Sequence, residues 1–199
     1  WSGWTLASAL MGARKSGQFP HIVSGFSDID FRSTAGQKSY EAPTGEQLQT
    51  LLKALPDLPT HHRPAIQVML VTGGRVGAVT SLKLDDLSDG GCELKRKGKE
   101  GTYWVPLPEP LYEELQQGFK FSSRVRVGDV LKEIIPVVPH GLRHQFATLA
   151  REGSVPLDAL ARLMDHSLPQ SMTESRYGTW PNERLKEEAS KVWQQLGFS

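Results

Sequence analysis

The sequence of 199 residues contains a single cysteine, Cys92. One cysteine cannot form an intramolecular disulfide and cannot make a thiolate metal site by itself, so the sequence predicts a protein of a reducing compartment. It also has no apolar run near the ~20 residues of a membrane span, and no basic segment followed by an apolar leader. We therefore expect a soluble, cytoplasmic protein with no membrane partner.

Neither sign of charge is in clear excess, because 23 lysines and arginines face 22 aspartates and glutamates and the formal net charge is +1. This balance gives only weak support for nucleic-acid binding, so the distribution of charge has to decide. Basic residues gather at 95–99 and at 124–126, which indicates a local basic surface. The sequence also lacks internal repeats and low-complexity tracts, and its 38% of hydrophobic residues is enough for a packed core.

Apolar residues recur at helical spacing along most of the chain after residue 43. Thr44 and Gln47 have the spacing of a capping box. The pattern changes to strands in CELKRK and TYWVPL, which flank a glycine-bounded turn and indicate a β-hairpin. The expected fold is mainly α-helical with a small antiparallel β-sheet. The expected helices cover residues 44–55, 64–71, 75–82, 110–117, 125–135, 140–151, 156–163 and 182–196.

The segment 139–179 carries the residues with the clearest chemical meaning. His140 and Arg143 open one expected helix, His166 follows the next, and Tyr177 lies eleven residues further on. When a tyrosine attacks a phosphodiester, the developing phosphorane needs fixed positive charge and the departing oxygen needs a proton. An arginine, two imidazoles and a phenol meet these needs, so their order predicts phosphoryl transfer to Tyr177.

Five segments resemble motifs of the tyrosine recombinases, the family that includes the phage integrases. LVTGGRVGAVTSLKLDDL resembles the family's first arginine motif, HGLRH its His-x-x-Arg motif, LMDHS its second-histidine motif, and SRYGT the segment with its nucleophile. The hairpin LKRKGKEGTYWVPLP resembles the one that carries the family's catalytic lysine. The motifs stand in the family's order over residues 44–179, and the ordered set is far more specific than any one of them.

The resemblance implies an enzyme that cleaves and rejoins DNA at specific sites, through a 3′-phosphotyrosyl bond to Tyr177 that conserves the phosphodiester energy. Arg75 and Arg143 would clamp the non-bridging oxygens, a task that suits a planar guanidinium better than a lysine. Because these arginines supply the positive charge, neither a metal ion nor another cofactor is expected. The expected partner is double-stranded DNA at the nucleoid, in a transposon, phage integration or chromosome-resolution setting.

The resemblance also implies roles for the other polar residues. His140 would assist proton transfer near the nucleophile, and His166 would hydrogen-bond a phosphate oxygen. Lys97 would protonate the departing 5′ oxygen from the hairpin. Lys99 also lies near the hairpin tip, so the sequence leaves two candidates for this acid, of which Lys97 is favoured. His144 is expected to pack structurally and to support these groups.

Three positions depart from the family's pattern. Ala78 stands where an acidic residue is frequent, three positions after the first arginine, so we expect part of the arginine's usual support to be absent or to come from elsewhere, with Asp86 as the candidate. Gly74 stands where leucine is usual, and Asp165 stands where glycine is usual. Because aspartate tolerates a left-handed helix end better than most residues, we expect His166 to keep its place.

Each assignment has an alternative without chemistry. Arg75 can be a surface ion-pair partner, Tyr177 can cap an apolar contact, and the hairpin lysines can be a solvated edge. His61 and His62 have no partner at metal-ligand spacing and are expected in a surface loop. The rival functions are a type IB topoisomerase or telomere resolvase, a non-catalytic DNA-binding relative and, as the weakest, a hydrolase that uses Asp86 and a histidine.

The ends of the chain carry the expectations about domains and assembly. Members of the family usually have a DNA-clamping domain, for which residues 1–41 are too short, so we expect an atypical N-terminal segment or a remnant of that domain before a catalytic domain at 42–199. The last expected helix, 182–196, has an apolar stripe for which we expect no groove in its own domain. The resemblance then implies a homo-oligomer on DNA, with a dimer at each site and a tetramer in synapsis, joined by this helix in trans. The alternative is that the helix packs on its own domain. The stripe consists of Leu185, Ala189, Val192, Trp193 and Leu196.

Overall fold

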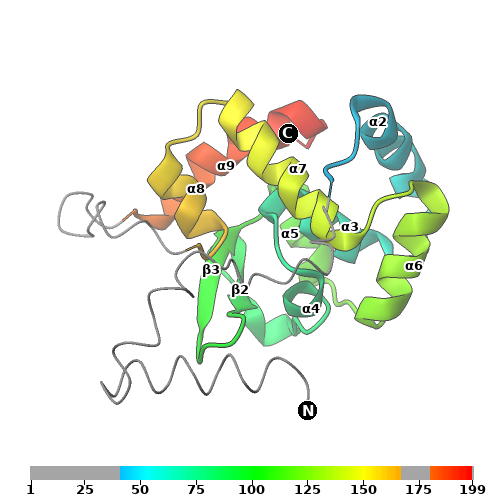
Figure 1. Ribbon diagram of the computed structural model, residues 1–199. Coiled ribbons are helices and arrows are strands. Elements are labelled where there is room, and N and C mark those ends of the chain that lie inside the picture. Colours follow the sequence, from blue (N-terminus) through cyan, green and yellow to red (C-terminus); the bar gives the residue numbers. More distant parts are fainter. Residues whose placement is uncertain (1–40, 167–179, 199) are drawn as a thin grey trace, which may run out of the picture. The chain divides into compact units, whose positions relative to one another are not determined.

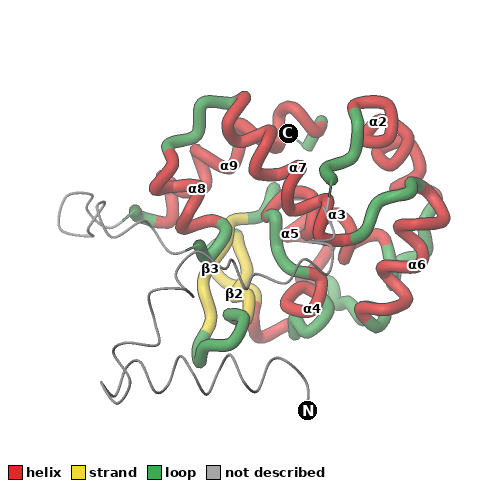
Figure 2. The backbone as a smooth tube through the Cα atoms, in the orientation of Figure 1, coloured by secondary structure: helices red, strands yellow, loops and turns green. Residues whose placement is uncertain are grey.

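The computed structural model describes residues 41–166 and 180–198, all of which belong to the unit Tyr40–Ser199. Tyr177, the expected nucleophile, lies outside the described residues. The described residues form mainly helices together with a small sheet (Figures 1 and 2), which confirms the expected fold class. The elements are α2 (Gly45–Ala54), η1 (Leu55–Asp57), α3 (Arg63–Thr72), α4 (Val76–Val79), η2 (Leu84–Asp86), β1 (Leu87–Ser88), β2 (Gly91–Lys95), β3 (Thr102–Pro106), α5 (Glu109–Gln116), α6 (Arg124–Ile134), α7 (Pro139–Glu152), α8 (Leu157–Leu163) and α9 (Asn182–Leu196).

Local sequence signals fix several helix ends. The capping box of α2 is present, because the Gln47 N–H donates to Thr44 Oγ1 at 3.3 Å and the Thr44 N–H donates to Gln47 Oε1 at 2.9 Å. The Ser123 hydroxyl caps α6 by accepting from the Arg126 N–H at 3.3 Å. Helix α3 ends at Gly73, whose φ of 64° is the left-handed conformation that glycine adopts at low cost.

The sheet has the strand order β1-β2-β3, and both pairs are antiparallel. Its main part is the expected hairpin, in which Leu94 pairs with Tyr103 and Lys95 with Thr102. Residues 96–101 therefore form a tip that projects beyond the last pair. The two-residue strand β1 was not expected from the sequence, because it is too short to show an alternating pattern.

Helix α3 lies at the centre of the helical part. Ten residues long, it contacts α4, α5, α6, α7 and α9, and all its residues from Pro64 to Thr72 except Gln67 are buried. A helix that is apolar on nearly every side is stable only inside a protein, which is why its sequence predicted a central position. Helix α7 crosses α3 in Figure 1, and this pair positions the residues of the site described below.

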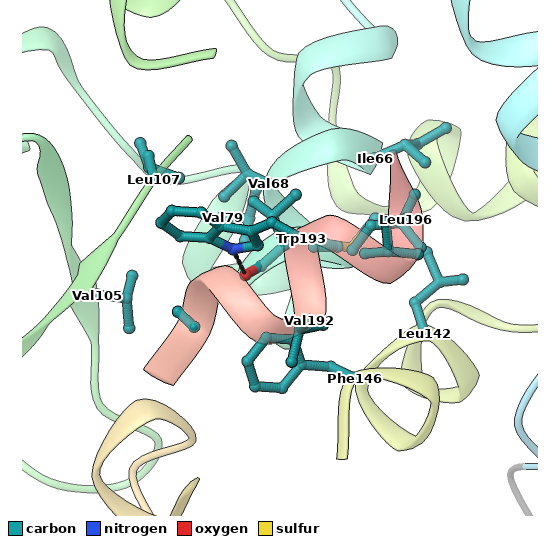
Figure 3. Packing of buried hydrophobic residues seen from close by; sticks show 14 of the residues in the cluster. Ile66, Val68, Val79, Val105, Leu107, Leu142, Phe146, Val192, Trp193 and Leu196 are labelled. Carbon is teal, nitrogen blue, oxygen red and sulfur yellow. Dashed lines mark hydrogen bonds between the residues drawn. The ribbon is translucent and has the colours of Figure 1, made fainter. Parts of the chain in front are cut away.

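Helix α9 packs into its own domain against α3, α7, α8 and β3. All five residues of its apolar stripe are buried, and the Trp193 indole N–H donates to the Val71 carbonyl of α3 at 2.9 Å (Figure 3). The expectation that this stripe lacks a groove in its own domain is therefore wrong. The sequence shows an amphipathic stripe, but it does not show that the end of α3 leaves both an apolar groove and an unpaired carbonyl to receive it.

Two smaller expectations also change. Leu157 is 55% exposed rather than buried, because α8 begins at this residue and turns it away from the core. His62 is only 5% exposed although its neighbour His61 is on the surface. Among the described residues, none of the helices has the length and apolar character that crossing a membrane requires.

Candidate functional site

A cleft of about 490 Å³ opens beside the start of α4, and the hairpin and the beginnings of α6 and α7 also line it. Its lining includes six lysines and arginines and one histidine, and no described residue with a carboxylate lines it. Such a concentration of one sign of charge favours an anionic ligand. The basic lining residues are Arg75, Lys95, Arg96, Lys97, Arg124, His140 and Arg143.

Arg143, in the first turns of α7, is the most enclosed of these cations. Its side chain reaches the end of α3, where Nη1 donates to the Gly73 carbonyl at 2.8 Å, and Nη2 donates to the Met164 carbonyl after α8. Burial, followed by the nearby charge of Arg75, lowers the pKa of Arg143, but an arginine stays protonated at neutral pH. Because both acceptors are neutral carbonyls, the positive charge is held in place without being neutralised.

The glycines after α3 make room for this arrangement. A Cβ on Gly73 would lie 2.8 Å from the ring of Phe146, and the residue also has a positive φ. A Cβ on Gly74 would lie 2.9 Å from both Leu94 and Val79. A leucine at position 74 therefore has no space here, which gives this departure from the family's pattern a packing reason.

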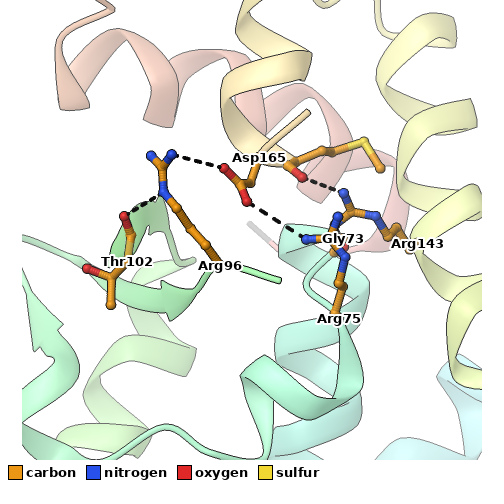
Figure 4. Close-up of polar contacts among 7 residues, drawn as sticks. Gly73, Arg75, Arg96, Thr102, Arg143 and Asp165 are labelled. Carbon is orange, nitrogen blue, oxygen red and sulfur yellow. Dashed lines mark hydrogen bonds and ion pairs between the residues drawn. The ribbon is translucent and has the colours of Figure 1, made fainter. Parts of the chain in front are cut away.

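Arg75 precedes the first turn of α4 and is the second arginine of the site. Its Nη1 lies 3.9 Å from Asp165 Oδ2, and the other oxygen of the same carboxylate lies 3.6 Å from Arg96 Nη1 (Figure 4). Asp86, which is also a described residue, forms no ion pair with Arg75, and its carboxylate instead accepts the Lys83 N–H at 2.7 Å. The expected acidic support of Arg75 is therefore present, but it comes from Asp165 rather than from Asp86.

The two expected histidines both lie close to the arginines. The His140 ring contacts the His144 ring edge-on at 4.9 Å between centroids, and partial burial, then His144 and Arg143, lowers the pKa of His140. Partial burial, then Arg143 and Arg75, lowers the pKa of His166. The lowered pKa values favour the neutral form of both imidazoles at pH 7. His144 is exposed and touches His140, so the expectation that it packs structurally was wrong although its contact with the site is real.

The hairpin tip separates the two candidate lysines. Both lysines are exposed, but Lys97 lines the cleft together with Lys95 and Arg96, whereas Lys99 is not part of the lining. The cleft thus brings together Arg75, Lys97, His140 and Arg143, and His166 lies within the field of the two arginines.

Sequence reasoning missed two residues of this region. Tyr103 on β3 is buried with its hydroxyl beside Arg143, and burial raises its pKa although Arg143 and Arg75 oppose that change. Arg96 contacts both Asp165 and the opposite side of the hairpin. For both residues the only signal in the sequence was that they belong to the hairpin motif. Their partners Arg143 and Asp165 lie 40 or more residues away along the chain, so no local pattern shows these contacts.

The chain is similar in sequence to known recombinases. No protein-family model matches it. It is 32% identical to the tyrosine recombinase XerA of Thermococcus kodakarensis over 155 residues, which are 64% of this chain and 54% of that protein. The chain therefore spans about half the length of the curated relatives it matches.

Solved integrases share the fold. The integrase from mycobacterium phage Brujita matches with a TM-score of 0.56 and 21% identity, over 96% of this chain and 73% of that one. A lambda integrase dimer bound to a COC′ core site matches with a TM-score of 0.58 and 17% identity, over 89% of this chain and 72% of that one. The chain thus has the fold of the catalytic domain of tyrosine recombinases and integrases, and it is similar in sequence to a member of that family.

Proposed function

We propose that this protein cleaves and rejoins double-stranded DNA at specific sites, with Tyr177 as the nucleophile. The observation that carries the proposal is the cleft in which Arg75, Lys97, His140 and Arg143 meet, although they come from three distant parts of the sequence. The DNA-bound lambda integrase supports the choice of substrate. A mobile element, a phage or chromosome resolution are the settings in which this reaction is used.

The two arginines bind the scissile phosphate in this mechanism. Arg143 is already fixed by the carbonyls of Gly73 and Met164, so its remaining N–H groups meet a non-bridging oxygen without reorganisation during the reaction. Arg75 adds a second charge from the start of α4. Together they stabilise the phosphorane, and His166 donates its imidazole N–H to another phosphate oxygen.

Two other groups move the protons. As the Tyr177 oxygen bonds to phosphorus, its proton passes to His140, whose lowered pKa favours the neutral ring that can accept it. As the bond to the 5′ oxygen breaks, Lys97 gives that oxygen a proton. The two transfers balance, and the reverse steps rejoin a strand without an external energy source because the phosphodiester bond was exchanged and not hydrolysed.

We also propose that the protein acts as a dimer at each site and as a tetramer in synapsis. The lambda integrase dimer on a core site and the lambda integrase tetramer on a Holliday junction support this assembly. The apolar stripe of α9 is not its interface, because that stripe is buried in its own domain.

The test is covalent capture of DNA. A library of nicked duplexes with a randomised core, in which the short fragment diffuses away after cleavage, is incubated with the protein and resolved on a denaturing gel. The proposal predicts a protein–DNA band that is lost in Tyr177→Phe, while binding of the selected duplex stays within a few-fold. Binding without any adduct would instead identify a non-catalytic DNA-binding protein.

A further inference from the structure

The carboxylate of Asp165 lies between two arginines that belong to different parts of the fold. Arg75 stands at the start of α4 and Arg96 stands on the hairpin, and each pairs with one oxygen of Asp165, at 3.9 Å and 3.6 Å (Figure 4). The side chain of Asp165 is only 14% exposed, so both contacts are partly shielded from water. One acidic side chain thus connects two cations that line the cleft.

The backbone at this position favours aspartate for a second reason. Asp165 follows α8 with a φ of 49°, a left-handed conformation that asparagine and aspartate tolerate better than other side chains. The carbonyl of its neighbour Met164 accepts a hydrogen bond from Arg143 Nη2. The turn therefore fixes one arginine through its backbone and two others through its side chain.

Arg96 transmits this contact to the hairpin. Its Nε donates across the tip to the Thr102 carbonyl at 3.0 Å, and its backbone N–H donates to the Gly101 carbonyl at 3.2 Å. The guanidinium is thus anchored in the hairpin while its outer end reaches Asp165. Lys97 is the next residue along the chain and lies in the exposed tip beyond the last paired residues, so its position depends on what holds Arg96.

Helix α4 offers Arg75 no acid of its own. Ala78 lies one turn after Arg75 and lines the same cleft, which is where an acidic side chain in the helix would reach the arginine. The acid that Arg75 does contact belongs to the turn after α8. The arrangement therefore couples the orientation of Arg75 to the position of the hairpin, which an acid at position 78 would not do.

We propose that Asp165 is a positioning residue that clasps the hairpin to the arginine cluster, so that Lys97 stays over the cleft and Arg75 keeps its direction toward the phosphate. This inference rests on the proposed function. Asp165 adds a negative charge beside a site for DNA, so its effects on DNA binding and on cleavage are expected to differ. Removing that charge is expected to leave DNA binding unchanged or stronger and yet to slow cleavage.

The experiment compares Asp165→Asn with Arg96→Gln in single-turnover cleavage of the selected duplex at saturating protein. Asparagine keeps the shape and the left-handed turn but loses the charge, and Arg96 is an exposed residue whose replacement leaves the core intact. Each variant is expected to cleave about tenfold more slowly, which corresponds to a modest change in the barrier. The double variant is expected to be no slower than the slower single variant, because both substitutions break the same contact, the ion pair between Asp165 and Arg96.

A second substrate shows whether the defect acts through Lys97. With a 5′-bridging phosphorothiolate, the leaving sulfur needs no proton, so the defects of both variants are expected to shrink to about threefold or less. Ala78→Asp in the Asp165→Asn background gives Arg75 a carboxylate but gives Arg96 none. On the phosphorothiolate, this double variant is expected to cleave at about the wild-type rate, because Arg75 is again supported. On ordinary DNA it is expected to stay slow, because Arg96 still lacks its partner.

Several outcomes would overturn the inference. Wild-type cleavage rates in both Asp165→Asn and Arg96→Gln would show that Asp165 does not position the hairpin. Equal defects on ordinary DNA and on the phosphorothiolate, combined with weaker DNA binding, would show the same. If Asp165→Asn fails to fold by circular dichroism, Arg96→Gln alone decides. An absence of cleavage by the wild type would count against the proposed function, whereas a cleaving wild type with unaffected variants would count against Asp165 alone.

Discussion

Replacing Trp193 tests whether α9 is part of the core that supports the site. The side chain is 5% exposed, and its indole N–H donates to the Val71 carbonyl, which is one of the last carbonyls of α3 and has no partner within that helix. Burying a tryptophan removes roughly 150–250 Å² from water, and truncating one to alanine in a core costs about 3–5 kcal/mol. Trp193→Ala is therefore expected to remove a large part of a stability of about 5–15 kcal/mol.

Trp193→Phe separates the hydrogen bond from the packing. Phenylalanine keeps most of the apolar contact but leaves the Val71 carbonyl buried without a donor, which costs about 1–3 kcal/mol. Urea unfolding followed by far-ultraviolet circular dichroism measures both variants. Gln194→Ala is the matched control, because Gln194 is the next residue of α9 but is exposed, and a change of no more than about 0.5 kcal/mol is expected there.

A Trp193→Ala variant as stable as the control would show that the buried indole contributes nothing to its own domain, contrary to its place in the core. The same variant is informative about the site. Val71 lies two residues before Gly73, whose carbonyl holds Arg143. Loosening the end of α3 is therefore expected to slow DNA cleavage as well as to destabilise the fold.

Three further predictions concern the chemistry. Lys97→Ala is expected to slow cleavage of ordinary DNA far more than cleavage of a 5′-bridging phosphorothiolate, whereas Lys99→Ala shows no such rescue; the reversed pattern in single-turnover assays would make Lys99 the acid. Affinity measured by fluorescence anisotropy is expected to fall ~10³-fold between 50 and 200 mM salt if about six phosphates are neutralised, and a flat titration would count against DNA as the substrate. Because the pKa values of His140 and His166 are lowered, the loss of cleavage on acidification is expected to have its midpoint below the ordinary histidine pKa of about 6.5; a midpoint above that value would contradict the lowered pKa values.

The sequence predicted elements better than it predicted contacts. The capping box of α2, the central α3 and the hairpin could be predicted because the residues that determine each of them lie within a few positions of one another in the sequence. The motifs singled out Arg75, Lys97 and Arg143 among the cations that line the cleft, but they did not single out Arg96. The placement of Tyr177 within the site remains a prediction.

The contacts that escaped prediction join distant segments. Asp165 replaces the missing acid at Ala78 from 87 residues away along the chain, and Trp193 meets Val71 across 122 residues. Nothing in a local pattern shows which groove an amphipathic helix will fill, so the stripe of α9 was assigned to a neighbouring protomer when the groove lay in its own domain. The choice of Asp86 as the acid beside Arg75 and the choice of a neighbouring protomer for α9 were wrong for the same reason. Tertiary packing decides among partners that the sequence leaves equally available.

The most direct test of strand cleavage by Tyr177 is to identify the amino acid that bears the DNA. The covalent adduct formed on the selected nicked duplex is digested with trypsin and nuclease, and the peptide that carries the residual nucleotide is sequenced by tandem mass spectrometry. The account predicts a phosphotyrosyl link on Tyr177, within the segment that follows His166. A nucleotide found on another residue, such as Tyr103, or the absence of any nucleotide-bearing peptide from an enzyme that binds the duplex, would contradict it.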